Sequence, residues 1–220
     1  MMKNLVRAAT VASVLSLGIT ANASAATINL ALGNNEFDIE WLHDVQPLEA
    51  TAHFTATVTN TFIDFTVAIS NLSPAVGSGI QSFGFNINPD VTAVSVTTAG
   101  AVFGSVGLEE NLPSIDNNID VCIFAANGCP GGGQGGNLDG GSSDTISFRL
   151  TGPFTNGATL TTFGIKFQTA FGSFEFEGNE PNGENPPPNG ENPPTTVPEP
   201  TSMVLVGLGL ASVIGARRRN

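Results

Sequence analysis

The segments TAHFTATVT at residues 51–59 and FIDFTVAIS at residues 62–70 decide the fold of this chain. Apolar residues occupy every second position of both segments, which is the pattern of half-buried β-strands. With Asn60-Thr61 as the turn, partner residues sum to 121 and the four apolar pairs fall on one face: Val58 with Ile63, Ala56 with Phe65, Phe54 with Val67 and Ala52 with Ile69. Polar pairs such as Thr57 with Asp64 fall on the other face. This agreement between register and burial predicts an antiparallel hairpin.

The same alternation continues on both sides of the hairpin, between breaks of Gly, Pro and Asn. It predicts further strands at residues 28–32, 37–41, 80–88, 91–98, 119–125, 144–151, 160–168 and 171–177. Short strands in this number, without a helical period, are typical of an all-β fold. We therefore expect an antiparallel β-sandwich, jelly-roll-like, over residues 26–177, with a core filled largely by phenylalanine rings.

The interior of the chain is strongly acidic. Of the 220 residues, 19 are Asp or Glu and 7 are Lys or Arg. Lys3, Arg7 and Arg217–Arg219 lie at the two ends, which leaves only Arg149 and Lys166 between them and a net charge of 2 − 19 = −17. Binding to phosphates requires clustered Lys and Arg. The composition therefore excludes nucleic acid as a partner, and it argues against an anionic lipid surface for the middle of the chain.

Residues 1–25 have the three parts of a secretory signal peptide. Lys3 and Arg7 are basic, residues 8–19 are uncharged and apolar, and Ala23-Ser24-Ala25 is a small-x-small cleavage site. The apolar run is shorter than the ~20 residues of a membrane-spanning helix, which disfavours a permanent N-terminal anchor. We expect export through the Sec machinery and cleavage after Ala25.

Residues 197–220 form a second targeting segment, in which an uncharged run at 201–216 lies between a short motif and a basic tail. The motif is Val197-Pro198-Glu199-Pro200 and the tail is Arg217-Arg218-Arg219-Asn220. A helix over 201–216 would be roughly 24 Å long, a little short of the ~30 Å hydrocarbon core. The arginines would stay on the cytoplasmic side. A plain C-terminal transmembrane anchor is one interpretation. The order of elements also resembles the PEP-CTERM sorting signal, which exosortase recognises in Gram-negative bacteria.

The resemblance implies that helix 201–216 holds the precursor in the inner membrane until exosortase cuts near Pro198-Glu199-Pro200. The product would then be released or attached to the cell surface, often in bacteria that make exopolysaccharide. On this interpretation the motif is a substrate of exosortase and not a catalytic site.

The composition changes abruptly at residues 178–196, where PNGENPP occurs twice in tandem, at 181–187 and 188–194. No large apolar side chain is present to offset the entropy of ordering a packed structure. We expect a disordered, extended linker that holds the folded domain clear of the membrane or wall. Slippage of a repeat in a tolerant linker would leave the same pattern.

Cys122 and Cys129 are the only cysteines. In an exported chain an even, closely spaced pair predicts a disulfide. A redox role is disfavoured because the spacing is not Cys-x-x-Cys and no basic residue lies nearby to stabilise a thiolate. The glycine-rich stretch 128–141 that follows lacks the Gly-Lys-Ser/Thr ending of a phosphate-binding loop. It is either a passive hairpin connection or a mobile binding loop.

The sequence does not predict an active site. His43 and His53 are the only histidines; His43 follows the strand that contains Trp41, and His53 lies on the predicted solvated face. Nucleophilic catalysis needs a base oriented onto a Ser or Cys, and no Gly-x-Ser-x-Gly elbow occurs. We therefore expect a protein without catalytic activity. Paired carboxylates, as in glycosidases, could still be present among the 19 acids.

Calcium is the one cofactor that the acidic composition suggests. One oxygen-rich cluster contains Asp116, Asn117, Asn118 and Asp120, and another contains Asn137, Asp139 and Asp144. Hard cations take six to eight such oxygens. Neither cluster has the EF-hand spacing, so ordinary polar turns are the favoured explanation and a calcium site at Asp116/Asp120 or Asp139/Asp144 is the alternative.

Together these patterns predict an exported cell-envelope or extracellular-matrix protein, without catalytic activity, whose partners are the Sec machinery and exosortase. The alternative is a surface module that binds an exopolysaccharide, with or without calcium. Sugar platforms generally expose aromatic rings, whereas Trp41 and most phenylalanines here fall in predicted buried stripes. A hydrolase is the third interpretation.

Overall fold

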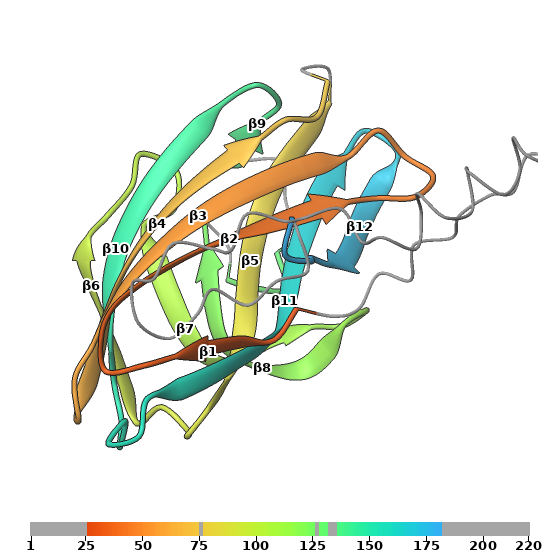
Figure 1. The fold of residues 1–220 in the computed structure, drawn as a ribbon. Helices are drawn as coiled ribbons and strands as arrows, with labels where there is room; N and C mark the ends of the chain where they lie inside the picture. The colour runs from red at the N-terminus through yellow and green to blue at the C-terminus, as the bar shows by residue number, and fades with distance from the viewer. Residues whose placement is uncertain (1–25, 75–76, 126–127, 132–135, 182–220) are drawn as a thin grey trace, which may run out of the picture.

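The computed structural model describes residues 26–74, 77–125, 128–131 and 136–181 (Figure 1). The predicted signal peptide, most of the predicted linker and the C-terminal segment with the helix predicted at 201–216 lie outside these ranges. The regular structure of the described part is β-strand, as predicted for an all-β domain. A search of these ranges for a helix long and apolar enough to cross a membrane found none.

The described residues form twelve strands, most of which overlap a predicted strand. Their bounds are β1 Ile28–Leu30, β2 Gly33–Leu42, β3 Glu49–Val58, β4 Phe62–Asn71, β5 Ser78–Asn88, β6 Ala93–Thr98, β7 Ser105–Leu112, β8 Asp116–Phe124, β9 Leu138–Asp139, β10 Ser143–Thr151, β11 Ala158–Thr169 and β12 Gly172–Glu177. Strands β7 and β9 were not predicted.

The strands form two antiparallel sheets (Figure 1). The five-stranded sheet has the order β2-β3-β4-β10-β6. The seven-stranded sheet has the order β1-β11-β5-β8-β7, with β12 paired to β11 and β9 paired to β5. The chain passes repeatedly from one sheet to the other, for example from β4 to β5 and from β10 to β11.

The hairpin that decides the fold has the predicted register. Val58 pairs with Ile63, and the pairing continues residue by residue to Ala50 with Asn71. The turn is Asn60-Thr61, closed by a 2.9 Å hydrogen bond from the Thr59 amide to the Phe62 carbonyl. The apolar members of these pairs are buried. The burial pattern of the sequence therefore fixed the register correctly, as expected where one face of a strand is buried.

Aromatic rings join the two sheets. Trp41 of β2 contacts Phe83 of β5 with ring centroids 6.3 Å apart, and Phe54 of β3 contacts Phe85 of β5 at the same separation. Phe37 stacks on Phe54 within the five-stranded sheet, at 4.7 Å. These contacts confirm the predicted phenylalanine-rich core, and edge-to-face and offset pairs of this kind add to the free energy of burying the rings.

The outer face of the seven-stranded sheet is covered by a second, smaller apolar cluster. It contains Leu112, Ile119, Cys122 and Cys129, with Ile115 and Phe124 packed against them. Gly164 in β11 leaves room for this layer, because a Cβ there would lie 2.9 Å from Ile115 Cδ1 and 3.0 Å from Leu112 Cδ1. As a result, nearly all of β5 is buried on both faces.

Two predictions about particular segments were wrong. Strand β1 ends at Leu30, so Leu32 lies outside it and is 52% exposed. The glycine-rich stretch 128–141 is not a hairpin connection, because it leads from β8 in one sheet to β10 in the other. Ordered contacts also continue past residue 177, where Asn179 forms an antiparallel bridge with Glu40.

Candidate functional site

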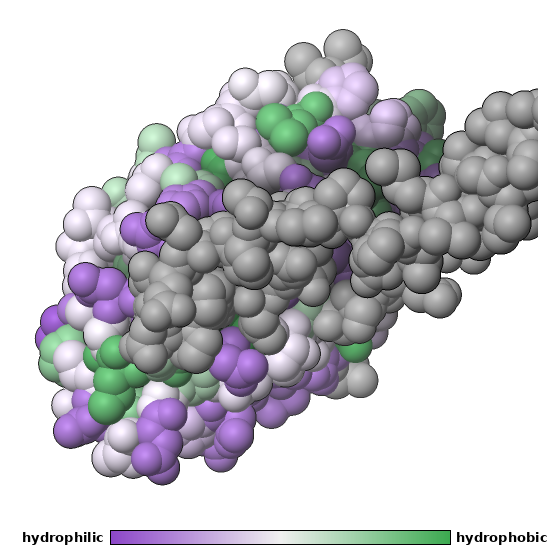
Figure 2. Space-filling view, in the orientation of Figure 1, coloured by the Kyte–Doolittle hydropathy of each residue, from purple (hydrophilic) through white to green (hydrophobic). Residues whose placement is uncertain are grey.

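The outer face of the five-stranded sheet is polar and open to solvent. Threonine and serine side chains lie side by side across β3, β4 and β10, as in the row formed by Thr55, Thr66 and Ser147. The hydroxyls of Thr66 and Ser147 are 2.8 Å apart. The outer face of the five-stranded sheet is therefore rich in hydroxyl groups across these strands and is not an apolar platform. On the side of the molecule in view in Figure 2, apolar residues form small separate groups among polar ones.

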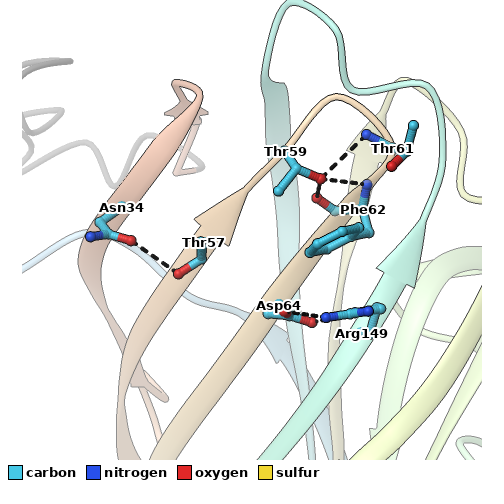
Figure 3. Close-up of polar contacts among 7 residues, drawn as sticks. All are labelled: Asn34, Thr57, Thr59, Thr61, Phe62, Asp64 and Arg149. Atoms are coloured by element: carbon cyan, nitrogen blue, oxygen red, sulfur yellow. Dashed lines mark hydrogen bonds and ion pairs between the residues drawn. The ribbon is translucent and has the colours of Figure 1, made fainter.

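Arg149 is the exposed cation of this face (Figure 3). Its Nε and Nη2 atoms each donate a 2.6 Å hydrogen bond to Asp64, and its guanidinium lies 3.9 Å from the centre of the Phe62 ring. Hydrogen bonding to Asp64 raises the pKa of Arg149. These contacts with Asp64 and Phe62 hold Arg149 in one position at this end of the sheet. The nearby hairpin turn is fixed by Thr59, whose hydroxyl accepts hydrogen bonds from the amides of Thr61 and Phe62.

Both histidines occupy structural positions. His53 is exposed, as predicted, and its Nδ1 lies 2.7 Å from Asp38 Oδ1 on the neighbouring strand. His43 Nδ1 accepts hydrogen bonds from the amides of Val45 and Gln46. Neither ring contacts a Ser or Cys side chain within the described ranges, so the structure does not bring a nucleophile to either histidine there.

Cys122 and Cys129 form a disulfide, as predicted. Both residues are fully buried in the small cluster outside the seven-stranded sheet. The Cys129 carbonyl accepts a 2.8 Å hydrogen bond from the Ser82 hydroxyl of β5. The disulfide therefore fixes the start of the glycine-rich stretch against the sheet.

Asp116 and Asp120 both bind the end of β5. The Asn86 side chain donates to Asp116 and accepts from the Asp120 amide, at 2.8 and 3.0 Å. Asp120 also accepts a 2.7 Å hydrogen bond from the Ile87 amide. These two carboxylates thus join β8 to β5.

Asp139 and Asp144 are separated by the structure. Asp144 is 9% exposed and accepts hydrogen bonds from the amides of Ala101, Val102 and Phe103 at 2.8–2.9 Å. Burial raises the pKa of Asp144, but these backbone hydrogen bonds outweigh that effect and hold the pKa below its ordinary value. Asp139 instead lies in β9, beside Gly79. No group of three or more His, Cys, Asp or Glu suited to a metal ion occurs within the described ranges. Calcium binding stays a prediction.

Lys166 and Glu175 form a buried ion pair on the outer side of the seven-stranded sheet. Their side chains are 9% and 4% exposed, and Lys166 Nζ lies 2.6 Å from Glu175 Oε1. The other carboxylate oxygen accepts a 2.7 Å hydrogen bond from the Ser114 amide. Burial raises the pKa of Glu175, but the Lys166 and Ser114 hydrogen bonds outweigh it and the pKa is lowered. Both basic residues of the described part are therefore neutralised by carboxylates.

A polar cleft of about 400 Å³ opens at the end of the molecule where β5 begins and β11 ends. Its lining residues are Gly77, Ser78, Gly79, Gly136, Asn137, Asp139, Gln168, Thr169 and Ala170. The next residue, Phe171, is 93% exposed in the turn between β11 and β12. The sequence analysis did not predict this cleft, because β9 has only two residues. The gap at Thr169-Ala170 between the predicted strands 160–168 and 171–177 was the signal that could have drawn attention to it, although the structure places Phe171, predicted to begin the second strand, in the turn.

Comparisons with known proteins identify one segment of the chain. The family model of the PEP-CTERM protein-sorting motif matches residues 196–219. Comparisons with curated proteins and with solved structures found no match. The matched segment contains the predicted sorting residues Val197–Pro200 and Arg217–Arg219, which lie outside the described ranges. The chain thus carries the PEP-CTERM sorting motif, which identifies it as an exported protein targeted to exosortase.

Proposed function

We propose that this protein is a non-catalytic component of the cell envelope or extracellular matrix, which displays a jelly-roll-like β-sandwich on a flexible linker after exosortase processing. The PEP-CTERM motif at residues 196–219 carries the proposal. Its role is sorting, and it follows the folded domain in the sequence. On this proposal the predicted helix at 201–216 holds the precursor in the membrane until cleavage near Pro198-Glu199-Pro200.

The contacts of the titratable groups support a role without catalysis. Asp144 is used to hold the loop between β6 and β7, and Glu175 is used to neutralise Lys166. His43 accepts hydrogen bonds from its own turn. Groups held in this way stabilise the domain and are poorly placed to exchange protons with a substrate.

Deletion of residues 201–220 tests the sorting. The truncated protein should lose surface retention and accumulate as soluble periplasmic or secreted protein. Mass spectrometry of the surface-located wild-type protein should recover peptides of the β domain but none from residues 205–217. Quantitative recovery of the 205–217 peptides from surface protein would mean that the segment is a permanent anchor.

A polysaccharide-binding module is the second candidate. Phe171 directly follows the cleft-lining residue Ala170 and has an exposed side chain, which favours this candidate, because saccharide sites commonly combine an aromatic ring with a few polar side chains. Both candidates require export, and they differ in whether the domain itself has a ligand.

A further inference from the structure

We propose that the cleft formed by β5, β9 and β11 binds a neutral saccharide chain, with Asn137 and Asp139 as polar ligands and Phe171 as the apolar contact. The saccharide class and the residues named here rest on the second candidate function above, and they are independent of how the protein is sorted.

Three adjacent strands build the cleft. Gly79 of β5 pairs with Asp139 of β9 on one side and with Gln168 of β11 on the other. Because Gly79 has no side chain, Asn137 lies directly over it: a Cβ at Gly79 would come within 2.6 Å of Asn137 Cβ. Asp139 and Gln168 thus lie on either side of a floor made by Gly79 and Asn137. Figure 1 shows β9 beside the start of β5 at this end of the molecule.

The two sides of the cleft differ in how their polar groups are used. Gln168 Oε1 accepts a 2.6 Å hydrogen bond from the Ser173 hydroxyl, and the Thr169 hydroxyl donates to the Gly172 carbonyl. The β11 side is therefore fixed by its own contacts. The side chains of Asn137 and Asp139, in contrast, have no hydrogen-bond or ion-pair partner within the described ranges. They present an amide and a carboxylate that can accept from, and in the case of Asn137 donate to, ligand hydroxyls.

The charge of the cleft selects the class of ligand. None of the described residues that line it is Lys or Arg, and Asp139 is acidic, so a phosphate, sulfate or uronate would be repelled. Its volume of about 400 Å³ is within the roughly 300–1,000 Å³ of small-molecule sites. A neutral saccharide offers both hydroxyl groups for the polar side chains and a C–H face for the ring of Phe171.

The test measures binding of defined oligosaccharides to the full-length chain in a detergent that contains no sugar. The neutral probes are hexamers of β-1,4-glucan, β-1,3-glucan, mannan and chitin, and an alginate hexamer is the anionic probe. We expect at least one neutral hexamer to bind with millimolar or better affinity, with saturation transfer from the protein to the C–H protons of its sugar rings, and we expect alginate not to bind.

Two variants locate the site. Phe171→Ala and Asp139→Asn should each weaken binding about tenfold, because each removes one main contact from exposed positions that the fold does not use. Leu32→Ala and Asp90→Asn make the matched changes at the opposite end of the domain and should bind as the wild type does. Binding of no neutral hexamer, binding of alginate alone, or equal losses in the control variants would each overturn the proposal.

Discussion

The two sheets use the same alternating sequence pattern but have different outer faces. The five-stranded sheet leaves its outer face in water, where Arg149 and Asp64 form an ion pair with side chains 42% and 39% exposed. The seven-stranded sheet is covered on its outside by the Cys122–Cys129 cluster, and its ion pair, Lys166 with Glu175, is buried. An ion pair between a basic and an acidic side chain is therefore present in an exposed and in a buried environment of one domain. Burial decides what each of the two pairs contributes to stability.

The covering layer also explains the hydrogen bond from the Ser114 amide to Glu175. Ser114 lies in the turn between β7 and β8, which folds over the outer face of the seven-stranded sheet. The buried carboxylate thus has two partners, a cation and an amide. A buried charge needs such partners, because removal from water costs several kcal/mol.

Lys166→Met should produce the largest effect of the substitutions that test this comparison. It leaves the Glu175 carboxylate buried without its cation, which should lower the free energy of unfolding by about 3–5 kcal/mol. Urea unfolding followed by the fluorescence of Trp41, which is buried, measures the loss. The double variant Lys166→Met with Glu175→Leu should recover much of it, because no unpaired charge remains. Equal losses in the single and double variants would show that packing, and not charge, is responsible.

Removal of the disulfide tests the covering layer itself. The double variant Cys122→Ala with Cys129→Ala removes a crosslink between residues seven apart, which should cost about 2.5 kcal/mol by chain entropy. If the covering layer shields the buried pair, hydrogen exchange at the Ser114 amide should also become faster. Unchanged exchange at Ser114 in a destabilised variant would mean that the disulfide and the ion pair are independent.

The sequence could predict the inner faces of both sheets but not the outer layer. The register of β3 and β4 follows from their own alternation, since the buried side of each strand is apolar throughout. In β5 the segment SFGFNI at residues 82–87 also alternates, yet Ser82 on its polar face is fully buried, because the second layer covers it and the Cys129 carbonyl accepts its hydroxyl hydrogen bond. Alternation shows which face of a strand is more apolar, and it cannot show whether the polar face is covered by a distant segment.

The candidate sites were predictable to different degrees. The disulfide followed from cysteine count and compartment, and the sorting motif followed from local order of residues. The cleft depends on pairing of Gly79 with both Asp139 and Gln168, residues 60 and 89 positions away along the chain. The acidic cluster of Asn137, Asp139 and Asp144 was close in sequence, but Asp139 and Asp144 belong to different sheets. The local sequence could therefore not show that these two carboxylates would be held by different sheets.

Asp144→Asn should have an intermediate effect, because Asp144 is nearly buried but is bound to backbone amides and not to a cation. Loss of the charge weakens three hydrogen bonds and should cost about 2 kcal/mol at neutral pH. The folded-state pKa of Asp144 is lowered, so its contribution is present above the ordinary carboxyl pKa and is lost as the pH falls through the folded-state value. Unfolding measured from neutral to acidic pH should therefore converge for wild type and variant at low pH. The exposed control Asp90→Asn should change stability little, and a constant difference at every pH would contradict the assignment to charge.

The exposed pair Arg149 with Asp64 should give the smallest effect, despite its two short hydrogen bonds. Water screens both charges, and ordering the two side chains costs conformational entropy, so exposed pairs contribute about 0.2–1 kcal/mol. The stacking of Arg149 on Phe62 adds an interaction of about the same size. A double-mutant cycle with Arg149→Gln and Asp64→Asn separates the pair from the stacking, because only Arg149→Gln removes both. We expect a coupling energy below about 1 kcal/mol that decreases in high salt. A coupling energy of about 3 kcal/mol that salt does not change would mean that the open face of the five-stranded sheet is covered in solution, as the outer face of the other sheet is.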